Sequence, residues 1–131
     1  MAHKVYNKPL IDKLGVKADS IVSVIGVEDK DFWKQLNERL NGMKEFGLKK
    51  NSDLIFFSAD SDVELKKLKT LKDYLNPDGA IWVVSLKGKQ AKIKDVGVIV
   101  AGKTAGLVDN KVVGFSGTHT ALRLVIPLSR R

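Results

Sequence analysis

The residues best suited to chemistry in this sequence follow its apolar runs, where buried strands would end. Two acids come directly after residues 21–27, and two lysines follow residues 80–86. Ligands of open parallel sheets bind outside the carboxyl ends of the strands, so these residues are expected to converge. A helix start beside two lysines could hold a small anion. The alternative is a set of ordinary loop residues in surface ion pairs. The candidate ligand-binding residues are Gly26, Glu28, Asp29, Asp60, Ser61, Lys87 and Lys89.

The turn after the first apolar run holds one glycine, Gly26, in the stretch VIGVED. A dinucleotide-binding turn uses three glycines, for the turn itself, for the approach of the pyrophosphate and for helix packing. Glu28 and Asp29 complement the dipole of a helix that starts there, but they would repel a pyrophosphate at that helix start. The stretch therefore predicts a strand end and a helix cap, and no cofactor is expected.

Metal and acid–base chemistry have few candidate residues. A metal site needs three or four ligands, whereas the chain has no cysteine and only two histidines, His3 and His119. His119 stands among Ser116, Thr118 and Thr120, and histidine titrates near neutrality. The residue could act as an acid or base, or it could be a turn histidine that bonds neighbouring hydroxyls. No nucleophile and base arrangement is visible, so neither a catalytic nor a metal-binding residue is assigned.

Composition predicts one globular domain over residues 1–131. The chain is 44% hydrophobic, and its formal charge is 23 − 15 = +8. A basic surface attracts polyanions, but the lysines are scattered and aromatic residues make up only 7%, so a nucleic-acid surface and a merely solvated basic surface both remain open. No apolar run reaches signal-peptide or membrane-spanning length, which favours a cytoplasmic protein without a membrane role.

The order of helical and strand patterns predicts an α/β fold, a three-layer sandwich on a mostly parallel sheet that ends in an antiparallel hairpin. In the helix at 29–40, Phe32, Leu36 and Leu40 share a face, either Asp29 or Asp31 can cap the start, and Gly42 should end it. Ser61 and Glu64 form a capping box at the start of the helix at 61–75. The other expected elements are a helix at 8–15, strands at 21–27, 53–59 and 80–86, and hairpin strands at 109–116 and 120–128.

Two segments need a separate argument. Residues 95–106 are rich in valine, which favours a strand, but parallel strands need crossovers of helical length, so we predict a helix that ends at Gly106. In the last strand Leu122, Leu124 and Ile126 form an apolar face, and Pro127 predicts a position at or near a sheet edge. Arg123, Arg130 and Arg131 would guard that edge, so we expect a monomer or weak dimer.

The stretch YLNPDGAIWVV, residues 74–84, resembles the helix-to-strand turn in the later half of Rossmann-like methyltransferases. A closer resemblance covers most of the chain. Residues 9–16, the lone glycine, LNPDGAIWV and residues 105–125 are similar to a family of short bacterial proteins of unknown function with a truncated methyltransferase-like fold. This resemblance implies the fold and leaves the activity open.

A full methyltransferase places two strand–helix units between its first and fourth strands, and an acid after its second strand holds the ribose of adenosylmethionine. Residues 30–53 have room for one helix and a connection, so that acid has no strand to follow. We therefore expect a non-catalytic or vestigial methyltransferase-like domain that binds a small ligand or a protein partner. The alternatives are a nucleic-acid-associated basic protein and a degenerate adenosylmethionine-dependent methyltransferase.

Overall fold

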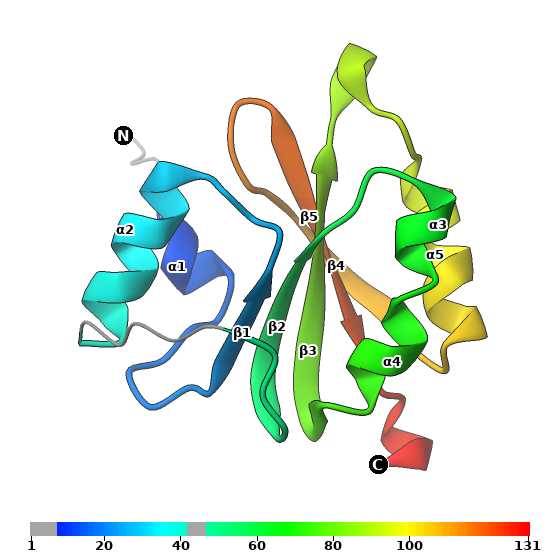
Figure 1. Cartoon of the computed structure of the whole chain (residues 1–131), viewed down its shortest axis with the longest axis horizontal. Helices are drawn as coiled ribbons and strands as arrows, with labels where there is room; N and C mark the ends of the chain where they lie inside the picture. The colour runs from blue at the N-terminus through cyan, green and yellow to red at the C-terminus, as the bar shows by residue number, and fades with distance from the viewer. Residues whose placement is uncertain (1–7, 42–46) are drawn as a thin grey trace, which may run out of the picture.

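The fold is a five-stranded mixed sheet with helices on both faces, as seen in a computed structural model that describes residues 8–41 and 47–131 (Figure 1). The strands lie in the order β1-β2-β3-β5-β4, and the first three are parallel. The predicted α/β class with a mostly parallel sheet and a terminal hairpin is confirmed. The elements are α1 Leu10–Lys13, β1 Val22–Ile25, α2 Lys30–Arg39, β2 Ser52–Ser58, α3 Asp62–Leu65, α4 Leu68–Lys72, β3 Leu75–Leu86, α5 Asp95–Thr104, β4 Val108–Gly114 and β5 His119–Val125, with short 3-10 helices at Gly88–Gln90 and Leu128–Arg130.

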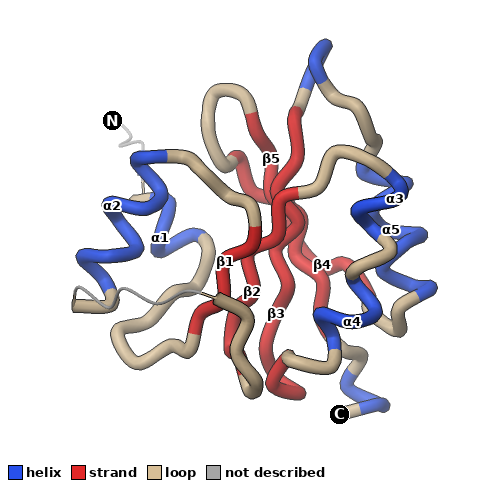
Figure 2. The backbone as a smooth tube through the Cα atoms, viewed as in Figure 1, coloured by secondary structure: helices blue, strands red, loops and turns tan. Residues whose placement is uncertain are grey.

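Successive side chains of each strand point to opposite faces of the sheet, and each face has its own hydrophobic core. On β2, Leu54 and Phe56 pack in the first core with α1 and α2, whereas Ile55 and Phe57 pack in the second with α3, α4 and α5. Figure 2 shows the two helical layers on opposite sides of the strands. This is the predicted three-layer sandwich.

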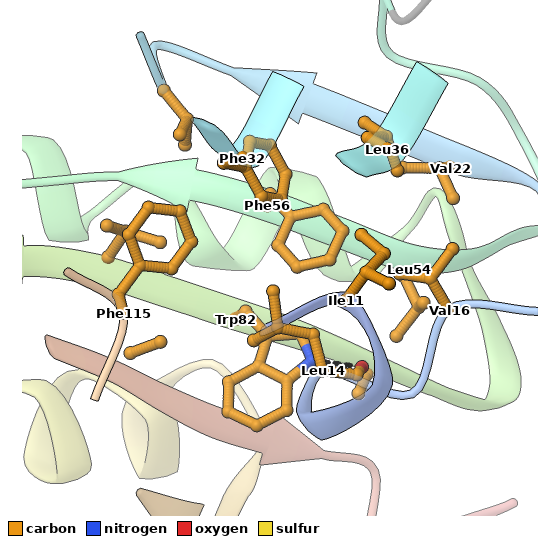
Figure 3. Packing of buried hydrophobic residues seen from close by; sticks show 14 of the residues in the cluster. Ile11, Leu14, Val16, Val22, Phe32, Leu36, Leu54, Phe56, Trp82 and Phe115 are labelled. Carbon is orange, nitrogen blue, oxygen red and sulfur yellow. Dashed lines mark hydrogen bonds between the residues drawn. The ribbon is translucent and has the colours of Figure 1, made fainter. Parts of the chain in front are cut away.

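The first core is rich in aromatic side chains (Figure 3). The ring centroid of Phe32 lies 5.0 Å from that of Phe56 and 5.2 Å from that of Phe115. Trp82 is buried, and its indole Nε1 donates to the carbonyl oxygen of Leu14 at 3.0 Å, which ties the segment after α1 to the middle of the sheet. The buried indole therefore keeps a hydrogen-bond partner.

The valine-rich segment at 95–106 forms helix α5, as predicted. Val98 and Gly102 on its inner face are buried against the second core. A Cβ on Gly102 would come within 2.9 Å of Leu124 Cδ2, so the glycine permits close packing of the helix on β5. Connection geometry thus overrides the strand propensity of the valines.

The helix predicted over residues 61–75 is divided into α3 and α4. The amides of Lys66 and Lys67 donate to the carbonyls three residues earlier, which tightens the turn between the two segments. Strand β3 then starts at Leu75, five residues before the predicted strand. Gly79 allows this start because a Cβ there would lie 2.6 Å from the Asp53 carbonyl oxygen.

The hairpin is formed by β4 and β5, but the predicted guard of its edge needs correction. Strand β5 pairs with both β3 and β4 and ends at Val125, so Pro127 lies outside the ladder and β4 is the edge strand. Exposed Asp109 and Lys111 flank a register shift on β4, and this irregular charged stretch protects the edge. Arg123 lies on the inner strand, where burial and the neighbouring charge of Arg131 lower its pKa.

Two of the residues named in the sequence analysis, His3 and Gly42, lie outside the described residues. No helix among residues 8–41 and 47–131 is long and apolar enough to cross a bilayer.

Candidate ligand-binding cavity

The carboxyl ends of the parallel strands and the β4–β5 turn enclose a cavity of about 310 Å³, here called the terminal cavity. Backbone turns after β1 supply one wall, and the hairpin supplies the opposite wall. Its lining residues are Gly26, Val27, Glu28, Asp29, Ser58, Val84, Phe115, Thr118 and His119. Three of the seven residues expected at a ligand site, Gly26, Glu28 and Asp29, are among them.

Gly26 shapes the floor of this cavity. Its φ is +80°, in the left-handed region that favours glycine, and a Cβ there would lie 3.4 Å from the Cβ of Ser58. The turn carries the chain from β1 into Val27, whose carbonyl oxygen accepts a 2.8 Å hydrogen bond from Trp33 Nε1. The indole of Trp33 is therefore attached to the wall of the terminal cavity.

The two acids after this turn differ in their roles. Asp29 is the N-cap of α2, and its Oδ1 accepts a 2.8 Å hydrogen bond from the amide of Phe32. Glu28 is exposed at the mouth of the cavity. The lining contains two carboxylates and no lysine or arginine. The charged lining therefore favours a cationic or neutral ligand over an anion.

The hairpin wall brings an imidazole and two hydroxyls together. Thr118 Oγ1 lies 2.8 Å from His119 Nδ1, and the His119 amide donates to Ser116 Oγ at 3.1 Å. Within the described residues no hydrogen bond joins the imidazole to a carboxylate. The arrangement is that of a turn histidine bonded to neighbouring hydroxyls, which was one of the two alternatives for His119.

Asp60 and Ser61 do not line the terminal cavity. Asp60 Oδ1 accepts from the amide of Leu86 at 2.9 Å, and Glu64 Oε1 accepts from the amide of Asp60 at 2.8 Å. Ser61 Oγ accepts from the amide of Glu64 at 3.1 Å, which confirms Ser61 as the cap, whereas Glu64 returns to the amide of Asp60 instead of that of Ser61. These side chains hold the loop that joins β2 to α3.

Lys87 and Lys89 are exposed beyond the end of β3 and are absent from the cavity lining. The amide of Lys87 donates to the Thr118 carbonyl at 3.0 Å, which fastens the end of β3 to the hairpin turn. Ser61, Lys87 and Lys89 were expected to hold an anion together, but none of the three lines the terminal cavity. Moreover, α3 has only four residues and therefore a weak dipole.

Sequence reasoning missed most of the opposite wall. Phe115 and Thr118 reach the cavity because β5 pairs antiparallel with β3, with His119 opposite Leu86. The register of a long-range strand pair decides this position, and the apolar alternation of the hairpin was the only local signal for it.

No metal site is evident in the part of the chain that the structure describes. There, no three His, Asp or Glu side chains are grouped so as to hold an ion.

Strand β1 is one of the two edge strands of the sheet. Among the described residues no strand pairs with it on the side away from β2. The described residues between β1 and β2 contain helix α2 and no other regular element. This agrees with the expectation that this segment holds no further strand–helix units.

Comparison with other proteins supports the fold. No family model matches the sequence, and no curated protein sequence matches it. The mitomycin 7-O-methyltransferase MmcR is similar in structure with a TM-score of 0.68 at 10% identity, over 91% of this chain and 52% of that chain. The methyltransferase CalO1 of calicheamicin biosynthesis, in its SAH-bound form, has a TM-score of 0.65 at 12% identity, over 90% and 52%.

A SAM-dependent methyltransferase from Aquifex aeolicus is similar over most of both chains, 90% of this one and 88% of that one, with a TM-score of 0.60 at 15% identity. The chain spans about half the length of MmcR and CalO1. The resemblance to a family of short bacterial proteins stays a prediction. In fold, this chain is a methyltransferase-like α/β domain.

Proposed function

We propose that this chain is a methyltransferase-like domain without transferase activity, which binds a small cationic or uncharged ligand in the terminal cavity. The observation that carries the proposal is the lining of that cavity, where Glu28 and Asp29 stand opposite Phe115 without any lysine or arginine. Open α/β sheets bind their ligands at this end of the strands. The fold supports this location, and the side chains support this ligand class.

The chemistry of the walls suits an organic cation with an apolar body. Val27, Val84 and Phe115 border the cavity with the small exposed parts of otherwise buried side chains. An aromatic ring at such a border attracts a cation. The exposed carboxylate of Glu28 adds an opposite charge, while Thr118 and His119 supply hydrogen-bonding groups. A cavity of this size lies at the lower end of small-molecule sites, which favours a compact ligand.

Methyl transfer is disfavoured by the edge position of β1 and by the single glycine of its turn. An acid that holds ribose hydroxyls would follow a strand paired with β1 on the side away from β2, and the described residues contain no such strand. Fold alone does not imply function. The second candidate, a degenerate adenosylmethionine-dependent enzyme, draws on the fold likeness to SAM-dependent enzymes.

Thermal-shift titration with adenosylmethionine, NAD and ATP separates these two candidates. We expect no saturable shift in the melting temperature with any of the three. Saturable binding of adenosylmethionine in the micromolar range would contradict the proposal and support the enzyme.

The ligand class is tested with choline and its uncharged isostere 3,3-dimethylbutan-1-ol. Because Trp33 is bonded to the cavity wall, its emission should change when choline binds, and more weakly with the alcohol. Glu28→Gln should weaken choline binding, whereas Glu38→Gln, a matched exposed acid on α2 outside the terminal cavity, should leave it unchanged. Equal binding of both probes, or absence of binding by either, contradicts the charge preference.

A further inference from the structure

A second, larger hollow lies on the opposite face of the sheet, between α3, α4 and α5. Its volume is about 540 Å³. It is separate from the terminal cavity, with which it shares no lining residue. We call it the helical groove, and its lining residues are Asp62, Leu65, Lys66, Lys69, Gly97, Val100, Ala101, Thr104 and Ala105.

The groove exists because α5 presents small side chains to it. Gly97, Ala101 and Ala105 recur at helical spacing and so follow one face of the helix. A Cβ added to Gly97 would meet nothing within 4 Å, so this end of the groove is open space. Val100 lines the same face and is 57% exposed, which leaves apolar surface in contact with water.

The charges of the groove lie on the wall opposite α5. Lys66 and Lys69 line it, are exposed, and form no ion pair with another described residue. Their positions three residues apart place both ammonium groups on the same side. Asp62 is the one carboxylate of the lining and stands at the start of α3, so the net charge of the lining is 2 − 1 = +1.

From this combination we infer that the helical groove binds a free single-chain amphiphile with an anionic head group. The apolar tail would lie along Gly97, Ala101 and Ala105, where it removes exposed apolar surface from water. The head group would meet the ammonium groups of Lys66 and Lys69. An apolar lining with a few placed charges is the usual composition of small-molecule sites.

The size of the groove favours a small molecule over a protein partner. Its volume lies within the range of small-molecule sites. Its nine lining residues fall well below the roughly 20 residues per side of a stable protein–protein interface.

The test is an NMR titration of the full chain with dodecanoate below its micelle concentration, with dodecyltrimethylammonium as the matched cation. We expect saturable shifts of amides in α3, α4 and α5 with dodecanoate and about tenfold weaker binding of the cation. Trp82 belongs to the first core and Trp33 packs against it, so their emission should stay constant and exclude binding at the terminal cavity. Equal affinity for both amphiphiles, or shifts outside these helices, overturns the inference.

Two variants locate the ligand. Gly97→Leu fills the open end of the groove and should abolish dodecanoate binding, while Gly97→Ala adds only a methyl group and should change the affinity by about twofold at most. Both replacements improve helix propensity, so loss of fold is not a competing explanation. Full dodecanoate affinity in Gly97→Leu overturns the placement.

The role of charge is tested with the double variant Lys66→Gln/Lys69→Gln. It should lower the affinity for dodecanoate about tenfold, whereas Lys30→Gln/Lys34→Gln on α2 should leave it unchanged. Binding to phosphatidylglycerol vesicles without binding of free dodecanoate would show that a membrane surface is recognised, and would overturn the inference of a free amphiphile.

Discussion

The two faces of the sheet are covered by cores of different side-chain composition. The first core contains Phe32, Phe56, Trp82 and Phe115, and its tryptophan is anchored by a hydrogen bond to a backbone carbonyl. The second core is almost wholly aliphatic. Directional contacts fix the position of α1 on the first face, whereas on the second face α3, α4 and α5 are held mainly by buried apolar area. The difference indicates that a mutation on the first face should displace particular segments, and one on the second face should lower stability more uniformly.

The largest effect is expected from removal of both hairpin strands. Strand β5 pairs with β3 from Ala80–Val125 to Leu86–His119 and contributes side chains to both cores. Deletion of residues 109–131 should therefore give an insoluble or molten product, as judged by solubility and thermal melting. Deletion of residues 128–131 alone is the control and should leave a cooperative transition. A soluble, cooperatively melting product of the longer deletion would show that the hairpin is an appendage.

A pair of adjacent core residues compares the faces directly. Trp82→Ala should lower the free energy of unfolding by about 3–5 kcal/mol and Ile81→Ala by about 2–5 kcal/mol, because each leaves a cavity in a closed core. Only Trp82→Ala removes the tie to Leu14, so hydrogen exchange in residues 10–16 should rise in that variant alone. Equal hydrogen-exchange rates in residues 10–16 of both variants would contradict the proposed difference between the faces.

The turn at Gly26 has a matched control in Gly15. Both glycines have positive φ, +80° and +78°. Alanine at either position should cost about 1 kcal/mol of stability in urea denaturation. Only Gly26→Ala should also alter choline binding, because Gly26 lines the terminal cavity and Gly15 does not. An equal change of affinity in the two variants would indicate a general loss of order.

The smallest effect separates two glycines of the same helix. Gly97→Ala should raise stability by about 0.5–1 kcal/mol, since the added methyl group meets open space and improves helix propensity. Gly102→Ala gains the same propensity but presses on buried Leu124, and should be about 1 kcal/mol less stable than Gly97→Ala. The melting temperatures of the two variants measure this difference. A higher melting temperature for Gly102→Ala would mean that Leu124 can move aside without loss of stability.

Most of the fold could be predicted from local patterns. Apolar runs located the strands. The N-cap of α2 is Asp29, one of the two expected caps, and the N-cap of α3 is Ser61 as predicted. The early start of β3 could not be foreseen because it depends on a close approach between Gly79 and the backbone of Asp53. The division between α3 and α4 is a local tightening of hydrogen bonds, and Leu65, Leu68 and Leu71 stay buried on both sides of it.

Only one wall of the candidate site could be predicted, because the other wall depends on contacts between segments far apart in the sequence. The wall at Gly26, Glu28 and Asp29 is continuous in sequence with β1, whereas the wall at Phe115 and Thr118 depends on the register between β3 and β5. Long-range register is a property of the assembled sheet. Lys87 and Lys89 were assigned to the site because they follow β3. In the structure both are exposed and neither lines the cavity.

The placement of α2 opposite α3 and α4 has a consequence for chain handedness. The steps from β1 to β2 and from β2 to β3 run in the same direction across the sheet, yet their connecting helices pack on opposite faces. The two crossovers therefore have opposite hands, and one is left-handed, although about 98% of such connections are right-handed. The usual twist of the chain cannot guide both crossovers during folding. In the folded chain the contacts of Phe32 with Phe56 and Phe115 hold α2 on the first face, so the aromatic cluster helps to maintain crossovers of opposite hand.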